Sequence, residues 1–381
     1  MFSKTINFIR KTFKIEKDFI PLHEPRFYGN ERKYVLDAID STFVSSVGKY
    51  VNKFEEMMCE LTGAKYAIAL VNGTNALHLS LILAGVKEKE EVLTQSLTFI
   101  ATANAISYCN AIPHFVDVDK ETMGLSPSLL KKHLEENTEQ RNGLCYNKQT
   151  GNRIAACVPM HTFGLPLYID ELVTICNEYN IPLVEDAAES LGSLYKGKHT
   201  GTFGLMGTFS FNGNKTITSG GGGAIVTDNE ELAKRAKHLS TQAKIPHKWE
   251  YKHDEIAYNY RMPNLNAALA CAQLEQLDGY IENKRELSDL YFAFFKGNKN
   301  ITLAREVKDA KANYWLNAVI LKDKETRDSF LENTNSNGIM TRPIWGLMTN
   351  LEMFKNSPKS DLLNAEWLEE RVVNITSSVR I

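Results

Sequence analysis

The chain has 381 residues, of which 43% are hydrophobic and 24% are charged, and its formal net charge is −2. These values are ordinary for a soluble globular protein of two or three domains, and they exclude the strongly basic surface typical of nucleic-acid binding. No run of about 18 apolar residues occurs, so we expect no transmembrane helix and a cytoplasmic protein.

The first 25 residues form a basic N-terminal arm. Phe2, Ile6, Ile9 and Phe13 recur at helical spacing, with lysine and arginine side chains between them. No small-residue cleavage site follows, so a signal peptide is not expected. A basic amphipathic helix can lie on a membrane surface, but we favour an arm that packs on its own subunit or on a partner. Any membrane contact is expected through this arm alone.

Short apolar strands then alternate with helices. The strands are expected at residues 65–71, 91–95, 113–119, 154–161 and 181–188, and helices at 76–85, 100–110 and 169–180 lie between them. Such alternation predicts an α/β fold with a mostly parallel sheet wound by right-handed crossovers.

The chain changes character twice after residue 206. Residues 207–227 read as two strands joined by a glycine-rich loop, and a helix leads out of them. From about residue 256 a long helical stretch (265–295) precedes a strand, a helix that ends at Gly338, and another strand. We therefore expect an arm at 1–25, a large α/β domain at 26–255 and a smaller α+β domain at 256–381.

A lysine and a carboxylate carry the strongest chemical signal. Lys215 lies in SFNGNKTITSGGGG, about 29 residues after Asp186, which ends an apolar strand. A pyridoxal phosphate (PLP) enzyme needs a lysine for a Schiff base with the cofactor aldehyde and a carboxylate that keeps the pyridine nitrogen protonated. Taken alone, Lys215 would be a solvated lysine and Asp186 a helix cap, but together they favour a PLP site.

Further residues fit such a site. Gly73, Thr74 and Asn75 lie between a strand and a helix, where backbone N–H groups form an anion site for a phosphate. Ser210 offers a hydroxyl to the same phosphate, and Phe99 ends a strand and offers a ring for stacking. Walker A and dinucleotide-binding patterns fail, because Gly213 is followed by Asn214 and the glycine run leads into a strand.

These motifs resemble the DegT/DnrJ/StrS family of PLP-dependent sugar aminotransferases. The resemblance covers residues from about 20 to the C-terminus and is carried by VNGTNALHLSL, SLTFIATANAI, VEDAAESLGSLYKGKHTGTFG, SFNGNKTITSGGGG and YNYRMPNLNAALACAQLEQL. It implies a fold type I aminotransferase architecture. FIPLHEPRFYGNE, STFVSSVGKY and IMTRPIWGLM are most similar to the C4 aminotransferases of legionaminic acid and bacillosamine pathways.

The resemblance also implies roles for individual positions. Lys215 and Asp186 would be catalytic, Glu189 would lie near the cofactor's phenolic oxygen, and Asn259 would reach the phosphate of a neighbouring subunit's cofactor in a homodimer. Arg261 would support the loop of Asn259. The sugar pocket is expected to use the turn at Ser45 to Lys49, together with His161, Tyr314 and Trp315.

The expected reaction is transamination of a nucleotide-linked 4-keto-6-deoxy-N-acetylhexosamine at C4. L-glutamate is the expected amino donor, and pyridoxamine phosphate is the cofactor form during turnover. The sugar is expected to be UDP- or GDP-linked. A C3 aminotransferase, a PLP-dependent dehydratase of the same fold and a non-catalytic PLP-binding regulator are the alternatives. Related dehydratases carry histidine in place of the lysine, so Lys215 favours transamination.

Overall fold

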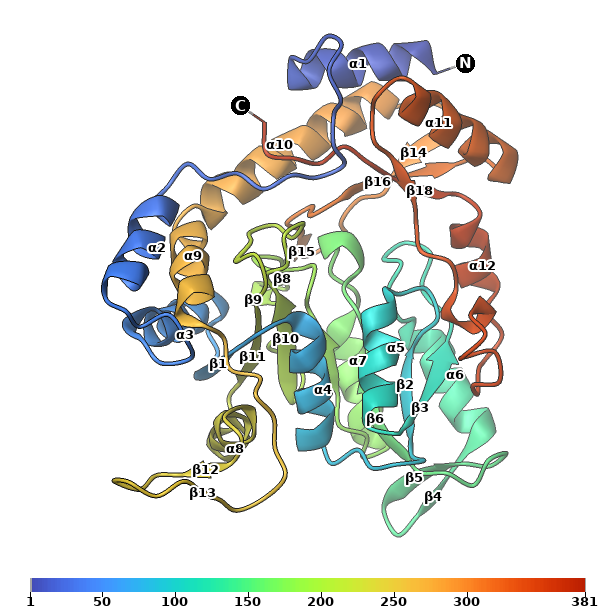
Figure 1. Cartoon of the computed structure of the whole chain (residues 1–381). Helices are drawn as coiled ribbons and strands as arrows, with labels where there is room; N and C mark the ends of the chain where they lie inside the picture. Colours follow the sequence, from blue (N-terminus) through green and yellow to red (C-terminus); the bar gives the residue numbers. More distant parts are fainter. Residues whose placement is uncertain (1, 381) are drawn as a thin grey trace.

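A computed structural model describes residues 2–380 (Figure 1). Its central sheet is formed by two segments, ordered β1-β11-β10-β7 and β3-β2-β6. Parallel bridges between Cys157 and Leu183 and between Met160 and Asp186 join β6 to β7. The strands are β1 (Tyr66–Leu70), β2 (Glu91–Gln95), β3 (Ile112–Val116), β6 (Ile154–Val158), β7 (Val184–Asp186), β10 (Met206–Ser210) and β11 (Gly223–Thr227).

The sheet is mixed because β11 runs against its neighbours. It pairs antiparallel with both β1 and β10, whereas β10 and β7 are parallel, as are β2, β3 and β6. The predicted pair of strands around the glycine-rich loop is therefore β10 and β11. The expectation of a mostly parallel α/β sheet is confirmed.

Alternate residues of the strands face different helices. Ile68 and Leu70 of β1 pack in a buried cluster with α4 (Gly73–Leu83), α5 (Ile100–Tyr108) and α8 (Glu230–Ser240). Ala67 and Ala69 face the other way, toward α3 (Lys49–Thr62) and α9 (Asn264–Leu274). At the β3 end, the second face is covered by α6 (Pro127–Asn137) and α7 (Ile169–Glu178). Because both faces are covered, the strands are almost continuously apolar.

The C-terminal part forms a second sheet, ordered β14-β16-β18-β17 and antiparallel throughout. Its elements are α10 (Leu277–Phe295), β14 (Ile301–Leu303), β16 (Asn317–Leu321), α11 (Lys324–Ser336), β17 (Arg342–Pro343), α12 (Leu363–Glu369) and β18 (Val372–Ile375). The predicted single helical stretch is divided into α9 and α10. Gly338 follows α11 with a φ of 70°, a conformation that glycine adopts readily.

Several smaller elements complete the chain. They are α2 (Glu31–Asp40), the pair β4 (Thr138–Arg141) and β5 (Leu144–Asn147), the pair β8 (Leu194–Tyr195) and β9 (Lys198–His199), with β15 (Ala310–Lys311) beside β8, and the hairpin of β12 (Lys244–Ile245) and β13 (Lys252–His253). The β12–β13 hairpin extends away from the body of the molecule (Figure 1).

The N-terminal arm contains α1 (Ser3–Phe13), which lies beside α10 and α11 (Figure 1). Ile9 is fully buried, and the Phe2 and Phe330 rings meet edge to face at a centroid distance of 5.0 Å. Phe8 stacks on Phe294 at 4.1 Å. The apolar face of the arm is thus covered by its own chain, which removes the surface that a membrane helix would insert. Among residues 2–380, no helix combines the length and apolar character needed to cross a bilayer.

Candidate active site

A cavity of about 370 Å³ opens where β7 and β10 end and where α4 and α5 begin. It is lined by Asn72, Gly73, Thr74, Leu77, Phe99, Ala101, Thr102, Met160, Asp186, Ala188, Glu189, Ser210, Asn212, Asn214, Lys215, Trp315 and Trp345. Ligands of α/β sheets bind beyond the carboxyl ends of strands, and this cavity has that position.

Lys215 extends into the cavity from the loop between β10 and β11. Its side chain is 12% exposed, and its Nζ lies 3.3 Å from Glu189 Oε1. The Nζ also lies 4.0 Å from the centre of the Trp315 ring, which comes from the C-terminal part of the chain. The ion pair with Glu189 and the contact with the Trp315 ring keep the Lys215 amine inside the cavity and away from bulk solvent.

Asp186 ends β7 and is almost completely buried. Its Oδ2 accepts a hydrogen bond of 2.8 Å from the Thr102 hydroxyl, and its Oδ1 accepts one of 3.2 Å from the Ala188 N–H. Burial raises the pKa of the carboxyl, although these two bonds oppose the rise. A buried carboxylate of this kind is stabilised by a cationic partner, and a protonated pyridine nitrogen would supply one.

Glu189 lies one turn beyond Asp186 and is also buried. Its Oε2 accepts a 2.9 Å hydrogen bond from the Phe163 N–H, and its Oε1 faces Lys215. Burial raises the pKa of this carboxyl as well, and the nearby lysine charge opposes the rise. The Lys215 amine therefore pairs with the buried Glu189 carboxyl group, and the buried Asp186 carboxyl group lines the same cavity.

The start of α4 forms one wall of the cavity. The Asn72 side chain caps the helix by accepting a 2.8 Å hydrogen bond from the Asn75 N–H. Gly73 touches β10 closely: a Cβ at this position would lie 2.8 Å from the Ser210 Cβ. Gly73, Thr74 and Ser210 line the cavity, whereas Asn75 does not. A helix start with this packing is suited to an anionic phosphate.

Aromatic side chains form the opposite wall. Phe99 immediately precedes α5, is 48% exposed and lines the cavity. Trp345 lies beyond β17, with its ring 6.4 Å from that of Phe99 and 5.0 Å from that of Phe163. Together with Trp315 these rings offer flat surfaces and limit the access of water.

Two residues expected in the sugar pocket lie elsewhere. His161 is fully buried; its Nε2 lies 3.1 Å from Glu185 Oε2 and its Nδ1 accepts a hydrogen bond from the Leu167 N–H. Tyr314 is buried with the Arg285 guanidinium over its ring. Neither lines the cavity, because both side chains are used in packing. The expected contact of His161 and Tyr314 with the sugar stays a prediction.

The remaining expected residues lie on another surface of the chain. Asn259 and Arg261 line a separate hollow with Ser46 and Val47, and Arg261 pairs with Glu55. The Ser45 carbonyl accepts a 2.6 Å hydrogen bond from Asn264 N. Lys49 pairs with Asp37 at 2.7 Å. Within one chain, Ser45, Lys49, Asn259 and Arg261 are therefore not part of the Lys215 cavity.

Sequence reasoning missed Thr102, Trp345, Asn212 and Asn214. Thr102 follows Phe99 by three residues on the first turn of α5, so helical spacing from Phe99 was a usable signal. Asn212 and Asn214 flank Gly213 immediately before Lys215, which was also a usable signal. Trp345 comes from the other domain, and no local pattern connects it to the site.

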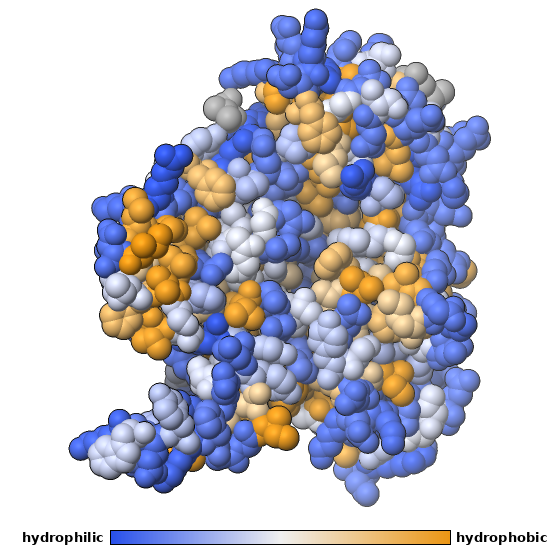
Figure 2. All heavy atoms as spheres, viewed as in Figure 1, coloured by the Kyte–Doolittle hydropathy of each residue, from blue (hydrophilic) through white to orange (hydrophobic). Residues whose placement is uncertain are grey.

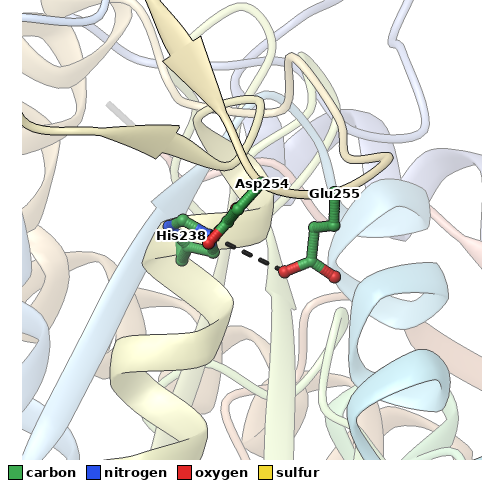
Figure 3. Close-up of side chains that lie close together, drawn as sticks. All are labelled: His238, Asp254 and Glu255. Carbon is green, nitrogen blue, oxygen red and sulfur yellow. Dashed lines mark hydrogen bonds and ion pairs between the residues drawn. The ribbon is translucent and has the colours of Figure 1, made fainter.

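The described residues contain one cluster with metal-ligand chemistry, formed by His238, Asp254 and Glu255 (Figure 3). His238 Nε2 lies 2.7 Å from Asp254 Oδ1 and 3.6 Å from Glu255 Oε1. The Arg235 guanidinium binds both oxygens of Glu255. Glu255 already has the Arg235 guanidinium as a partner and Asp254 already has the His238 ring, so the cluster is a surface hydrogen-bond and ion-pair network near the β12–β13 hairpin.

A lysine beside one buried carboxyl group, with a second one lining the same cavity at a helix N-terminus, is the arrangement that a PLP-dependent enzyme needs. Residues 26–381 match the DegT/DnrJ/EryC1/StrS aminotransferase family. The chain belongs to this family of PLP-dependent sugar aminotransferases.

Individual relatives agree with this assignment. The GDP-perosamine synthase of Escherichia coli O157:H7 is 38% identical over 361 residues, which cover 94% of this chain and 93% of that protein. The GDP-perosamine synthase of Vibrio cholerae is 36% identical and covers 88% of each chain. The structure of Helicobacter pylori PseC, an aminotransferase involved in pseudoaminic acid biosynthesis, has a TM-score of 0.84 at 23% identity and covers 94% of both chains.

The cavity fits the cofactor that the family uses. Bound PLP supplies an aldehyde that takes up an amino group and a ring that accepts the electrons of a broken C–H bond. Asp186 has the charge and burial to hold the ring nitrogen, and Lys215 has an amine that can carry a proton. Thr74, Ser210 and the start of α4 would hold the phosphate.

Proposed function

We propose that this protein transfers an amino group to C4 of a nucleotide-linked 4-keto-6-deoxyhexose, with L-glutamate as the donor. The observation that carries the proposal is the Lys215 amine, which is 3.3 Å from buried Glu189 in the cavity that also contains Asp186. This arrangement supports proton transfer at a carbon next to the nitrogen, which transamination requires and simple cofactor binding does not.

The side chains of the site would have separate roles in this reaction. The Lys215 amine would move a proton between a carbon of the substrate and a carbon of the cofactor. Glu189 would keep the amine in place. Asp186 holds the positive charge of the ring nitrogen. Trp315 and Trp345 shield the reacting centre from water, which would otherwise compete with the amine.

Two nucleotide sugars are candidates for the amino acceptor. The sequence motifs favour 4-keto-6-deoxy-N-acetylglucosamine and a route to legionaminic acid or bacillosamine. Two of the relatives at 36–38% identity are GDP-perosamine synthases, which favours a GDP-linked 4-keto-6-deoxy sugar. Both candidates place the ketone at C4, so both agree with the proposed reaction.

The proposal is tested by incubating the PLP-loaded protein with L-glutamate and each candidate sugar. We expect a product whose mass corresponds to replacement of the carbonyl oxygen by an amine, with NMR placing the amine at C4. An amine at C3 would indicate the alternative transaminase. Loss of water or oxygen from the sugar without gain of nitrogen would indicate a dehydratase and contradict the proposal.

We also propose a homodimer with shared active sites. Figure 2 shows apolar residues gathered over α2 and the loop after it. Leu36, Ile39, Phe43, Val44 and Val47 are all between 40% and 69% exposed there. A patch of this kind marks a protein interface. It adjoins the hollow of Asn259, so a second copy on this patch would bring Asn259 toward the partner's cavity.

A further inference from the structure

The first turn of α5 brings a hydroxyl group to the cavity. Phe99 and Thr102 both line it, and the Thr102 N–H donates a 3.3 Å hydrogen bond to the Phe99 carbonyl oxygen. Thr102 is only 1% exposed, so its hydroxyl needs a partner inside the protein. That partner is the Asp186 carboxylate, whose Oδ2 lies 2.8 Å from the Thr102 Oγ1. The same turn therefore places the Phe99 ring and the Thr102 hydroxyl.

The two buried carboxyl groups of the cavity have different partners. Glu189 has a cationic partner, because the Lys215 Nζ lies 3.3 Å from its Oε1. The carboxylate oxygens of Asp186 instead accept hydrogen bonds from neutral donors, the Thr102 hydroxyl and the Ala188 N–H. Burial raises the pKa of Asp186, and the Thr102 hydrogen bond is the strongest influence against that rise. The negative charge of Asp186 thus depends on one neutral side chain.

The direction of this hydrogen bond is fixed by chemistry. An ionised carboxylate can only accept hydrogen bonds, so the single hydroxyl proton of Thr102 points to Asp186. The Thr102 oxygen is then the acceptor in its 3.2 Å contact with the hydroxyl of Thr98, which is completely buried. Two buried hydroxyl groups therefore lie in a row that ends at the carboxylate.

We infer that Thr102 is a positioning residue for the cofactor: its hydroxyl keeps the Asp186 carboxylate ionised and in one orientation, so that it pairs with the protonated ring nitrogen. A carboxyl group and a pyridine can share one proton in two ways, as carboxylate with protonated ring or as carboxylic acid with neutral ring. A hydrogen bond donated to the carboxylate stabilises the first of these. Since the protonated ring is the better electron acceptor, Thr102 acts on the reaction through Asp186.

The test compares Thr102→Val, which has a similar shape but no hydroxyl, with Thr102→Ser, which keeps the hydroxyl. Thr208→Val is the matched control, because Thr208 is equally buried and its hydroxyl donates to the Glu185 carbonyl oxygen at 3.1 Å and not to Asp186. The Kd of PLP is measured by fluorescence titration of the cofactor-free proteins. We expect Thr102→Val to raise it about 10- to 100-fold, since a hydrogen bond to a charged group is lost. We expect Thr102→Ser to recover most of the loss and Thr208→Val to match the wild type.

Two further readouts separate the pairing with the ring nitrogen from simple packing. A PLP analogue with carbon in place of the ring nitrogen cannot pair with Asp186, so we expect Thr102→Val and the wild type to bind it equally well. With PLP labelled with 15N at the ring nitrogen, the NMR resonance of the bound cofactor is expected to move toward the neutral pyridine value in Thr102→Val only. Melting temperatures of the cofactor-free proteins show whether each variant is folded. If Thr102→Val does not fold, Thr102→Ala replaces it with the same expectations.

The inference is wrong in any of three cases. The first is a folded Thr102→Val protein that binds PLP as tightly as the wild type. The second is an equal loss of affinity for PLP and for the analogue, which would give Thr102 a packing role alone. The third is a Thr102→Ser protein as weak as Thr102→Val. These measurements need neither a sugar nor an amino donor, so their result is independent of the proposed function.

Discussion

Lys215 differs from the other lysines of the chain in what surrounds its amine. Lys196, for comparison, pairs with Asp170 at 2.6 Å on the surface, and its side chain is 51% exposed. The Lys215 side chain is 12% exposed and faces Glu189 and Trp315. An amine that is held in one place inside a cavity is positioned to react with a bound cofactor and substrate.

We predict that Lys215→Ala abolishes transamination, with a decrease in kcat of at least about 10³-fold, since both the attachment point and the proton carrier are removed. The absorbance band that the wild type acquires with PLP should be lost, whereas Lys196→Ala should keep both properties. Steady-state assays and absorption spectra measure these effects. A Lys215→Ala protein with the wild-type spectrum would contradict the assignment of the lysine.

At the scale of single residues, the sequence predicted the parts of the site that are local. Gly73 and Phe99 lie where a helix starts after a strand, and Asp186 is the last residue of a strand. Positions at the carboxyl ends of strands meet at one edge of a sheet. Trp345 could not be predicted, because it enters the cavity from the C-terminal part of the chain, far away in sequence. Nor could the sequence show that tertiary packing makes His161 and Tyr314 buried neighbours of Glu185 and Arg285.

Two elements of the fold meet closely where α4 begins against the end of β10. Gly73 allows this approach, since a Cβ there would lie 2.8 Å from the Ser210 Cβ and 3.2 Å from its Oγ. The contact brings the helix N-terminus and the Ser210 hydroxyl to the same side of the cavity. Phosphate binding thus depends on how two elements pack.

We predict that Gly73→Ala weakens PLP binding about 5- to 100-fold, because the added methyl group separates α4 from β10. Gly279→Ala is the matched control: a Cβ at that position of α10 meets open space. The control should be neutral or slightly stabilising, as expected for alanine in a helix. The Kd is measured by fluorescence titration of the cofactor-free protein. Equal affinity in both variants would contradict the predicted role of the α4–β10 contact.

The long helix α10 contains a buried lysine. Lys284 is fully buried, and its Nζ donates to the carbonyl oxygens of Trp315 and Ser377 without a carboxylate partner. Burial lowers its pKa from 10.5 to about 7. Above pH 7 the folded chain thus gives up a proton that the unfolded chain keeps until about pH 10.5.

We predict that Lys284→Met removes this pH dependence. Since the unfolded wild type binds more protons between pH 7 and 10.5, the free energy of unfolding contributed by Lys284 increases with pH, by no more than about 1.4 kcal/mol per unit. Denaturant titrations of both proteins across this range give the difference in unfolding free energy. A difference that stays constant with pH would show that Lys284 keeps its ordinary pKa.

The order of helices and strands was predicted well, but their pairing was not. Apolar runs identify β1 and β11 as strands, whereas nothing local shows that they lie side by side and antiparallel. The stretch 265–295 has helical periodicity throughout, yet it divides at Glu275 and Gln276, where the chain passes from α9 to α10. Pairing and breaks of this kind are decided by contacts between distant segments.

At the scale of the whole molecule, two apolar surfaces differ in their exposure to solvent. The apolar face of α1 is covered by α10, α11 and β14 of the same chain. The apolar patch on α2 and the loop after it stays exposed, and Trp249 and Tyr251 of the β12–β13 hairpin are 75% and 84% exposed. The exposed patch on α2 agrees with the proposed homodimer, since contiguous exposed apolar residues often mark a protein interface.

Mixing two inactive variants tests the proposed shared site. In a hybrid of a Lys215→Ala chain and an Asn259→Ala chain, one cavity has both defects, while the other combines the intact Lys215 of one chain with the intact Asn259 of its partner. Random re-association makes half of the dimers hybrids, so we expect about a quarter of the wild-type activity to return. The assay requires dissociation and re-association before the measurement, with each variant treated alone as the control. If Asn259 served the cavity of its own chain, the second cavity of a hybrid would still lack it, and mixing would restore nothing beyond the activity of the Asn259→Ala protein.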